Sequence, residues 1–217
     1  MSAPKLSMRL VVAVTSATAL LEINKIPSLI RAISGLQAFW PTLPLTVAAS
    51  ASDASPVSEI LERHKISHEL LRCDPIDPRA FAVALAPECE ISDALLIHDA
   101  SRPLTSPEQF SRILAAFEDS VDAVRPTISF TETLKIIKSN SIIRETLDRT
   151  KVKRISTPEL IRNSAIDVNG QNCGWFLPLK KSAQTVQIEG SPEALRINSS
   201  ADRELLESFL HWRQRKI

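Results

Sequence analysis

The chain has 217 residues, of which 44% are hydrophobic and 24% are charged, so it can bury one sizeable core and is neither disordered nor fibrous. Lys and Arg number 26 against 25 Asp and Glu, a formal net charge of +1, which excludes a sequence-wide attraction to nucleic acid or to an anionic membrane. The four glycines stand at positions 35, 170, 174 and 190, which excludes a glycine-rich phosphate loop before residue 35 and between residues 36 and 169.

The first half of the chain alternates short β-branched apolar runs with segments of helical period. Proline follows a serine cap at two of the predicted helix starts, Pro56 and Pro107, where its missing N–H costs nothing. We expect strands at 10–14, 45–49, 68–71, 94–98 and from 123, and helices at 27–39, 56–64, 78–86 and 107–117. Strands separated by helices cannot be joined by tight hairpins, so we expect an α/β fold: a mostly parallel, Rossmann-like sheet with helices on both faces.

The pattern changes after Pro126. Residues 133–137 and 141–145 flank a Lys-Ser-Asn turn, which predicts a β-hairpin. The remaining predicted elements are a short helix opening at Thr157, strands at 185–189 and 195–197, and a terminal helix from 200 to about 213. We expect a single domain over residues 1–217, with residues 130–156 as an arm that leaves the main sheet.

The sequence gives no sign of a secreted or membrane-bound protein. Three cysteines with no metal-binding or redox spacing, and no secretory segment, predict reduced thiols in the cytoplasm. The apolar stretch 10–21 is interrupted by hydroxyl residues and is too short to span a bilayer. The basic run 149–154 has no interleaved aromatic residues, so we expect no nucleic-acid partner.

The strongest candidate for chemistry is Asp99, which directly follows the apolar strand at 94–98 and precedes Arg102 by three residues. Ligands of open α/β sheets bind beyond the carboxyl ends of the strands. There the carboxylate could bind a divalent cation or sugar hydroxyls, and the guanidinium could hold a phosphate. The alternative is that the two residues pair with each other or cap a loop. We expect His98 to be a hydrogen-bonded histidine at the strand end.

The segment HDASRP at residues 98–103 resembles the HDAARP segment of the 2-C-methyl-D-erythritol 4-phosphate cytidylyltransferases, enzymes of isoprenoid precursor synthesis. Further matches follow in the family's order. ETLK at 132–135 resembles the family's DTxK, LDR at 147–149 its VDR, STPE at 156–159 its TPQ, and Glu189-Gly190 with Arg196 its EG…K element. Near the start, residues 21–29 resemble the family's LxxGKPLL. The resemblance covers nearly the whole chain.

This resemblance implies a nucleotidyltransferase fold, CTP and methylerythritol phosphate as substrates, Mg²⁺ as cofactor with Asp99 as a candidate ligand, and a homodimer formed through the arm. The implied substrate-binding residues are Asp99, Ala100, Arg102 and Thr133, together with Arg149 and Thr157, which would reach from the arm to the substrate phosphate of the neighbouring subunit. Arg196 stands where the family has a lysine that supports the transferring phosphate, and is a catalytic candidate.

The sequence departs from the family where the nucleotide should bind. The family opens with a glycine loop carrying Arg and Lys, whereas this chain has Thr15 and Ser16 there and no Gly, Lys or Arg between Leu10 and Asn24. Lys25 is a catalytic candidate if the shortened loop turns it inward. The alternative is a solvated lysine before a helix. In the family's cytosine-reading segment, Arg79 is kept and a serine is replaced by Ala82.

Three functions stay open at this point. The chain could transfer CMP from CTP to methylerythritol phosphate, with weakened activity because two cationic groups are missing. It could be a degenerate homologue that binds a sugar phosphate and transfers nothing. It could also be a structural dimer partner of an intact relative.

Overall fold

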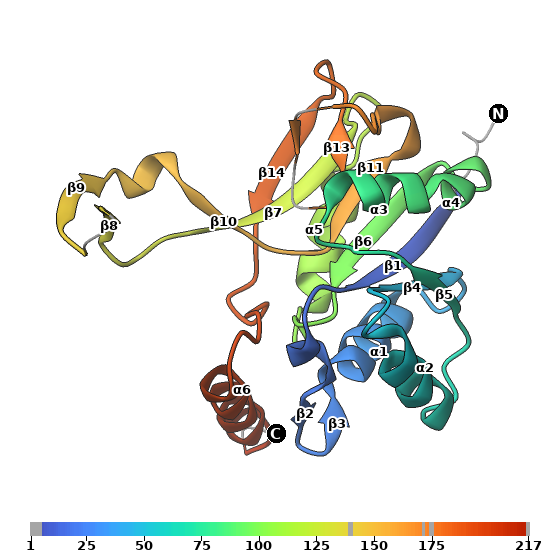
Figure 1. Cartoon of the computed structure of the whole chain (residues 1–217), viewed down its shortest axis with the longest axis horizontal. Coiled ribbons are helices and arrows are strands. Elements are labelled where there is room, and N and C mark those ends of the chain that lie inside the picture. The colour runs from blue at the N-terminus through green and yellow to red at the C-terminus, as the bar shows by residue number, and fades with distance from the viewer. Residues whose placement is uncertain (1–5, 139–140, 171, 174–175, 216–217) are drawn as a thin grey trace.

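The computed structural model describes residues 6–138, 141–170, 172–173 and 176–215. An eight-stranded sheet forms its centre (Figure 1). Its strands are β1 (Met8–Val14), β4 (Leu45–Ala49), β5 (Glu69–Arg72), β6 (Ala94–Asp99), β7 (Ala123–Ser129), β10 (Lys153–Ile155), β11 (Glu159–Arg162) and β14 (Thr185–Glu189). The strand order is β10-β7-β11-β6-β1-β4-β5, and β14 also pairs with β7. Strands β6, β1, β4 and β5 are parallel, as are β14 and β7. The predicted mostly parallel α/β sheet is confirmed.

Strand β1 is buried on both faces, which explains its continuous apolar run. Leu10 and Val12 pack in one core layer, against α1 (Ser28–Phe39), α2 (Ala54–Arg63) and α5 (Pro107–Ala116). Val11 and Ala13 pack in the other layer, which contains α3 (Pro78–Ala84). The helices therefore cover both faces of the sheet, as predicted (Figure 1).

Three local predictions are wrong. The helix predicted at 78–86 is divided at Leu85 into α3 and α4 (Ala86–Glu90), because Pro87 has no N–H with which to continue the helical hydrogen bonding of α3. The helix predicted at Thr157 is instead strand β11, which lies antiparallel between β6 and β7. The strand predicted at 195–197 is a loop, since its backbone groups bond to loops beside the site rather than to a strand.

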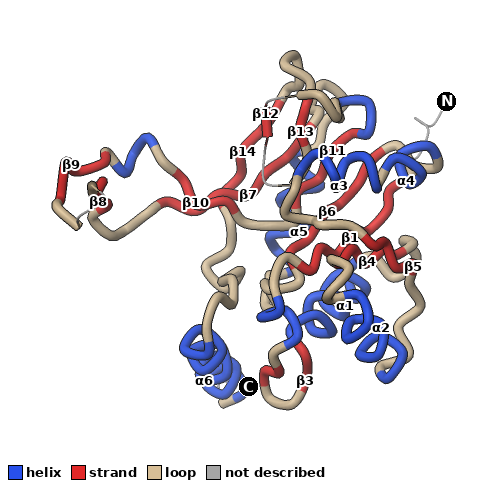
Figure 2. Tube along the Cα trace, viewed as in Figure 1, coloured by secondary structure: helices blue, strands red, loops and turns tan. Residues whose placement is uncertain are grey.

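Smaller elements lie outside the main sheet. They are η1 (Ala17–Leu20), β2 (Glu22–Ile23), β3 (Ile26–Pro27), β8 (Leu134–Ile137), β9 (Ile143–Leu147), η2 (Arg149–Lys151), η3 (Asn163–Ala165), β12 (Asn172–Cys173), β13 (Pro178–Leu179) and α6 (Ser200–Gln214). Strands β8 and β9 pair as the predicted hairpin, which projects from the sheet (Figure 2). Residues 130–156, which contain this hairpin, are called the arm. The Ser139-Asn140 part of its predicted turn lies outside the described residues.

A buried ion pair holds β11 beside β7. Arg125 Nε lies 3.3 Å from Glu159 Oε1, and the carboxylate side chain is fully buried. Glu159 follows the Thr157-Pro158 segment that leads from the arm into the sheet. A charge at this depth is tolerated because an opposite charge faces it.

We therefore expect Arg125→Met to lower the free energy of unfolding by about 3 kcal/mol, because Glu159 loses its guanidinium partner in a buried site. Urea unfolding measures this. The matched control is the double variant Arg125→Met/Glu159→Leu, which removes both charges and should recover most of the loss. A single variant as stable as the parent chain would contradict the role given to this pair.

Candidate active site

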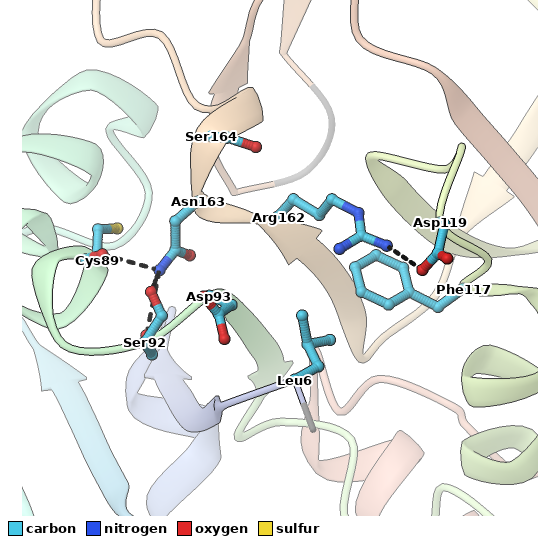
Figure 3. Close-up of a pocket in the computed structure, with 9 residues that line it drawn as sticks. All are labelled: Leu6, Cys89, Ser92, Asp93, Phe117, Asp119, Arg162, Asn163 and Ser164. Carbon is cyan, nitrogen blue, oxygen red and sulfur yellow. Dashed lines mark hydrogen bonds and ion pairs between the residues drawn. The ribbon is translucent and has the colours of Figure 1, made fainter. Parts of the chain in front are cut away.

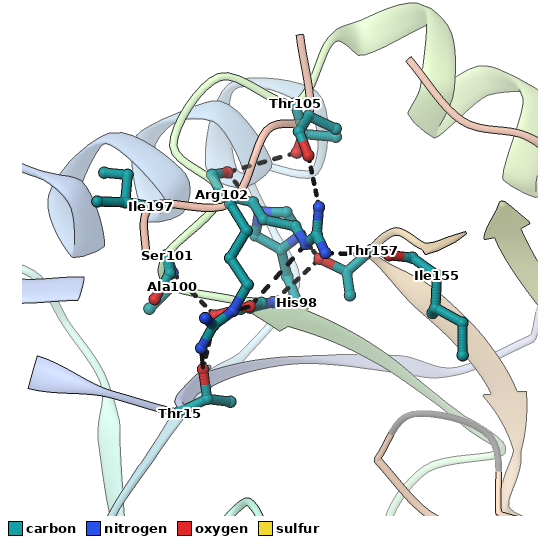
Figure 4. Close-up of polar contacts among 12 residues, drawn as sticks. Thr15, His98, Ala100, Ser101, Arg102, Thr105, Ile155, Thr157 and Ile197 are labelled. Atoms are coloured by element: carbon teal, nitrogen blue, oxygen red, sulfur yellow. Dashed lines mark hydrogen bonds and ion pairs between the residues drawn. The ribbon is translucent and has the colours of Figure 1, made fainter. Parts of the chain in front are cut away.

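Asp99 is fully buried at the carboxyl end of β6, beside the end of β1. Its Oδ1 accepts hydrogen bonds from the Thr15 hydroxyl at 3.0 Å and from the Ser101 amide at 2.9 Å. Its Oδ2 accepts one from Arg196 Nε at 2.8 Å. The parallel pairing of β1 with β6 thus places Asp99 and Thr15 at the same edge of the sheet. Figure 4 shows Thr15 together with Ala100 and Ser101, the two residues that follow Asp99.

Arg196 comes from the loop that follows β14 and uses each of its three guanidinium nitrogens. Nε binds Asp99, Nη2 donates to the Thr15 hydroxyl at 2.9 Å, and Nη1 donates to Asn198. The side chain is 21% exposed. Because a buried carboxylate fixes it, this guanidinium is held in one orientation with part of its surface open to solvent.

A cavity of about 400 Å³ lies beside these residues and is lined by Thr15, Pro75, Ile76 and Arg196. Of the described residues that line it, Arg196 alone carries a charge. The cavity stands at the end of the first strand, where the sequence predicts the nucleotide. It therefore offers an anion one fixed guanidinium and an apolar wall.

His98 and Thr157 form a chain of hydrogen bonds that ends at the backbone amide of Asp99. His98 Nε2 lies 3.0 Å from the Arg102 carbonyl, and since a carbonyl only accepts, Nε2 carries the proton. Nδ1 then accepts from the Thr157 hydroxyl at 2.9 Å, which itself accepts the Asp99 amide at 3.1 Å. Burial lowers the pKa of His98 from 6.5 to about 4, against the opposing effects of the Arg102 carbonyl and Asp99. His98 is a neutral, hydrogen-bonded histidine at the strand end, as predicted.

Arg102 is almost completely buried. Its terminal nitrogens donate to the carbonyls of Ala194, at 2.6 Å, and Ile155, at 3.0 Å. Burial lowers its pKa to about 10, with Asp99 opposing and Arg196 and Arg154 adding to the shift, so it stays charged at neutral pH. Two guanidinium groups, those of Arg196 and Arg102, thus lie beside the one carboxylate, and Arg154 acts on Arg102. The excess positive charge favours an anionic ligand here.

The family model for 2-C-methyl-D-erythritol 4-phosphate cytidylyltransferase matches residues 8–173. The chain belongs to this family. A family member from Acidobacterium capsulatum is 25% identical over 207 residues, which cover 89% of this chain and 87% of that protein. Another, from Frankia casuarinae, is 26% identical over 194 residues, 85% of this chain and 70% of that protein.

Solved structures show the same fold. The 4-diphosphocytidyl-2C-methyl-D-erythritol synthase of Anaerococcus prevotii superposes with a TM-score of 0.71 at 16% identity and covers 95% of this chain and 99% of that chain. The 2-C-methyl-D-erythritol 4-phosphate cytidylyltransferase of Thermus thermophilus gives 0.69 at 16% identity and covers 95% and 100%. The Rossmann-like fold expected from the family motifs is confirmed.

Ala100 lies with Asp99, but only its backbone acts. The side chain is buried, the amide donates to the Ala13 carbonyl at 2.9 Å, and the carbonyl accepts from the Ser28 hydroxyl at 2.7 Å. Ser16 is on the loop after β1, where its hydroxyl lies 2.5 Å from that of Thr18. Thr18 in turn donates to the Ile197 carbonyl at 2.8 Å. The first loop of this family member is thus tied to the loop that carries Arg196.

Three further substrate-binding candidates belong to the arm or its base. Two of them, Thr133 and Arg149, are exposed on the arm, which projects away from the sheet that carries Asp99. Arg149 Nη1 donates to the Thr131 carbonyl. The third, Thr157, is not on the arm's free part: it is buried at the arm's base with its hydroxyl bonded inside its own chain. The expectation that Thr157 reaches a neighbouring subunit is wrong, because β11 draws this segment into the sheet.

Three other candidates lie outside the cluster. Lys25 is exposed in the turn between β2 and β3, with a positive φ of 63°, so the condition for its role, a loop that turns it inward, is not met and it is the solvated lysine of the alternative interpretation. Arg79, on α3, donates to the Val168 carbonyl at 3.1 Å. Ala82 packs in the core layer with Phe81, because the inward face of α3 is apolar. Ala82 is therefore not placed to read a base.

Sequence reasoning missed Arg154 and Asn198. Arg154 belongs to the basic run 149–154, which gives no sign that one member acts on Arg102. Asn198 holds the third nitrogen of Arg196. The sequence offers one signal for Asn198: it is a polar residue two positions after the catalytic candidate Arg196.

Asp99 does not fit as a ligand of the Mg²⁺ that the resemblance implies. Magnesium takes an octahedron of oxygens, usually one or two carboxylates with waters and substrate phosphates. Both Asp99 oxygens already accept hydrogen bonds, from Thr15, Ser101 and Arg196. The described part of the chain contains no group of three or more His, Cys, Asp or Glu side chains arranged to hold a metal. The cation that Asp99 holds is a guanidinium.

A larger cavity, of about 650 Å³, lies at the opposite edge of the sheet (Figure 3). Arg162 crosses it, 4.6 Å from the centre of the Phe117 ring, and donates to the Val121 carbonyl at 2.9 Å. None of the site residues predicted from the sequence lines this cavity.

None of the helices among the described residues has the length and apolar character to span a bilayer.

The depressed pKa of His98 makes stability depend on pH. The folded protein protonates His98 only near pH 4, whereas the unfolded chain does so near 6.5. Stability is therefore lost as the pH falls from about 6.5 toward 4, by up to about 3 kcal/mol. Urea unfolding at several pH values measures the slope. The variant His98→Gln keeps the hydrogen-bonding groups without the titration and should flatten it. Identical slopes would contradict this account.

Proposed function

We propose that this protein transfers CMP from CTP to 2-C-methyl-D-erythritol 4-phosphate. The observation that carries the proposal is the position of Arg196, which binds the buried Asp99 on one side and lines the cavity beside β1 on the other. Family membership supplies the substrate classes. In this proposal the sugar phosphate lies near Asp99 and the triphosphate enters the cavity.

In the transfer, an oxygen of the substrate phosphate attacks the α-phosphorus of CTP. The bond from that phosphorus to the bridging oxygen breaks, and pyrophosphate leaves with the electron pair. Such reactions depend on positioning and on neutralising charge at the transferring phosphorus. Arg196 supplies that charge at the cavity wall. Asp99 and Thr15 hold it in place before the substrate arrives, so little reorganisation is needed.

Arg196 compensates in part for the positive charge that the first loop lacks. The family's glycine loop carries Arg and Lys, and this chain has neither there. Arg196 provides one cation from the other side of the cavity, and Arg102 and Arg154 add positive potential behind it. We expect turnover by this mechanism, reduced by the missing second cation.

We also propose that the protein is a cytoplasmic homodimer in which the partner's arm completes the substrate phosphate site. Arg149 is exposed on the arm and bonded only to its own hairpin base among the described residues. It cannot meet the phosphate near Asp99 of its own chain because the arm projects away (Figure 1).

A second candidate is a sugar-phosphate-binding homologue without nucleotide transfer. The cavity wall formed by Pro75 and Ile76 favours it, because apolar side chains stand where a triphosphate needs donors. In that case methylerythritol phosphate binds and CTP does not.

Pyrophosphate release from CTP and methylerythritol phosphate, in buffer with MgCl₂, tests the proposal. Arg196→Met should lower kcat by about 10²-fold or more, since it removes a preorganised cation. Arg196→Lys is the matched control, keeps the charge and should retain most activity. Asp99→Asn should lower kcat because the guanidinium loses its anchor.

The two candidates separate in the same experiment. Parent protein that releases no pyrophosphate, yet binds methylerythritol phosphate by calorimetry and not CTP, would replace the first function with the second. Calorimetry with Arg196→Met shows whether that residue holds the sugar phosphate.

A further inference from the structure

Arg196 lies on a loop that no sheet pairing holds. Residues 190–197, which follow β14 and are called the Arg196 loop, form neither helix nor strand. Backbone hydrogen bonds fix the two ends of this loop. The amide of Gly190 donates to a carbonyl of β7 at 2.9 Å, and the amide of Ile197 donates to the Ser101 carbonyl at 2.8 Å. Between these ends, the position of the loop depends on the side chains that contact it.

Gln109, a fully buried residue of α5, contacts the start of this loop. Its side-chain Oε1 accepts a hydrogen bond from the Ser191 amide, and its Nε2 donates to the Thr157 carbonyl at 2.7 Å. Only one orientation of the side-chain amide satisfies both contacts, because a backbone N–H only donates and a carbonyl only accepts. One side chain therefore connects the Arg196 loop to the segment that precedes β11.

The segment on the other side of Gln109 supports Asp99. The Thr157 hydroxyl accepts a hydrogen bond from the Asp99 amide at 3.1 Å and lies 2.9 Å from His98 Nδ1. Gln109 thus fixes the distance between two segments, of which one carries Arg196 and the other bonds the backbone of Asp99. The ion pair between Arg196 and Asp99, at 2.8 Å, closes this ring of contacts.

The first two turns of α5 hold Gln109 and Ser191 together. The hydroxyl of Ser106, which caps the helix, accepts a hydrogen bond from the Gln109 amide at 3.4 Å and lies 2.8 Å from the Ser191 hydroxyl. Arg112 Nη2, further along the helix, donates to the same Ser191 hydroxyl at 3.3 Å. Because these residues belong to one helix, the start of the Arg196 loop is held against a fixed part of the fold.

Packing around Gly190 leaves little space for the loop to shift. A Cβ atom at Gly190 would lie 2.9 Å from Ile128 Cγ1, closer than such atoms approach in folded proteins, and 3.3 Å from Ser156 Cβ. It would also lie 3.5 Å from Gln109 Oε1. The loop therefore starts directly against the residue that precedes Thr157, and this close approach requires glycine at position 190.

We propose that Gln109 is a positioning residue: it holds the start of the Arg196 loop against the Thr157 segment and thereby keeps Arg196 on Asp99 and at the cavity wall. The inference rests on the proposed function, because it concerns the cation that neutralises the transferring phosphate. Gln109 is not among the described residues that line the cavity, so it acts through Arg196. Without its side-chain amide, the Ser191 amide and the Thr157 carbonyl lose this partner within buried residues.

Gln109→Met tests the inference, because methionine has a similar length and forms neither hydrogen bond. We expect kcat for pyrophosphate release to fall about 10-fold or more, since a displaced cation acts less on the transition state. KM for each substrate should change less than about threefold, because the cavity lining is unaltered. The matched control is Ile113→Val on the same helix. It removes a methyl group from a fully buried side chain, which lowers global stability, and it should leave kcat and KM unchanged.

Hydrogen exchange measures how firmly the loop is held, without turnover. In Gln109→Met, the amides of residues 190–197 should exchange at least about 10-fold faster than in the parent chain, while those of β1 stay within about twofold. Ile113→Val should show no such difference between the loop and β1. If Gln109→Met does not fold, Gly190→Ala takes its place. The added Cβ displaces the same loop, so this variant should show the same effects on exchange and on kcat.

Either of two results overturns the inference: a Gln109→Met chain whose loop exchanges as in the parent chain, or one whose kcat equals that of Ile113→Val. The proposed function fails in a different way. A parent chain that releases no pyrophosphate refutes the transfer reaction, while the exchange experiment still decides whether Gln109 holds the loop. Unchanged kcat and exchange in an active protein would refute only the role of Gln109.

Discussion

The ion pair between Arg196 and Asp99 joins positions 97 residues apart, and the architecture of the site depends on it. Asp99 is fully buried, and a charge at that depth requires an opposite charge and hydrogen bonds to be stable. Arg196 supplies the charge, while Thr15 and the Ser101 amide supply hydrogen bonds. The loop after β14 is thereby fixed over the carboxyl edge of the sheet.

Further contacts hold this arrangement from three directions. Arg102 anchors the loop through the Ala194 carbonyl and the arm's base through the Ile155 carbonyl. The Thr18 hydroxyl bonds the Ile197 carbonyl, so the first loop is tied in as well. Thr157, two residues before β11, accepts a hydrogen bond from the Asp99 amide at the end of β6. Hydrogen bonds therefore join the first loop, the end of β6, the base of the arm and the late loop that carries Arg196.

The family's fold persists here at 16% identity to solved relatives, although the segment between Leu10 and Asn24 contains no Gly, Lys or Arg. A glycine loop neutralises a triphosphate with backbone amides and with its own cations. This chain has hydroxyl residues there, and its fixed guanidinium comes from the opposite side of the cavity. Because the same arginine also neutralises Asp99, loss of Arg196 affects both the buried carboxylate and the cavity. The site is therefore more dependent on one residue than a site with separate cations.

Sequence alone determined the alternation of strands and helices, the placement of Asp99 at a strand end, the hairpin arm and the family, because each rests on local periodicity or on short ordered motifs. It could not place Thr157, whose segment reads as a helix start but forms β11, since pairing with both β6 and β7 outweighs local preference. It could not tell that Lys25 ends in a distant turn while Arg196 reaches Asp99. Those outcomes were decided by tertiary structure, because burial and long-range charge pairing depend on which segments the sheet order brings together.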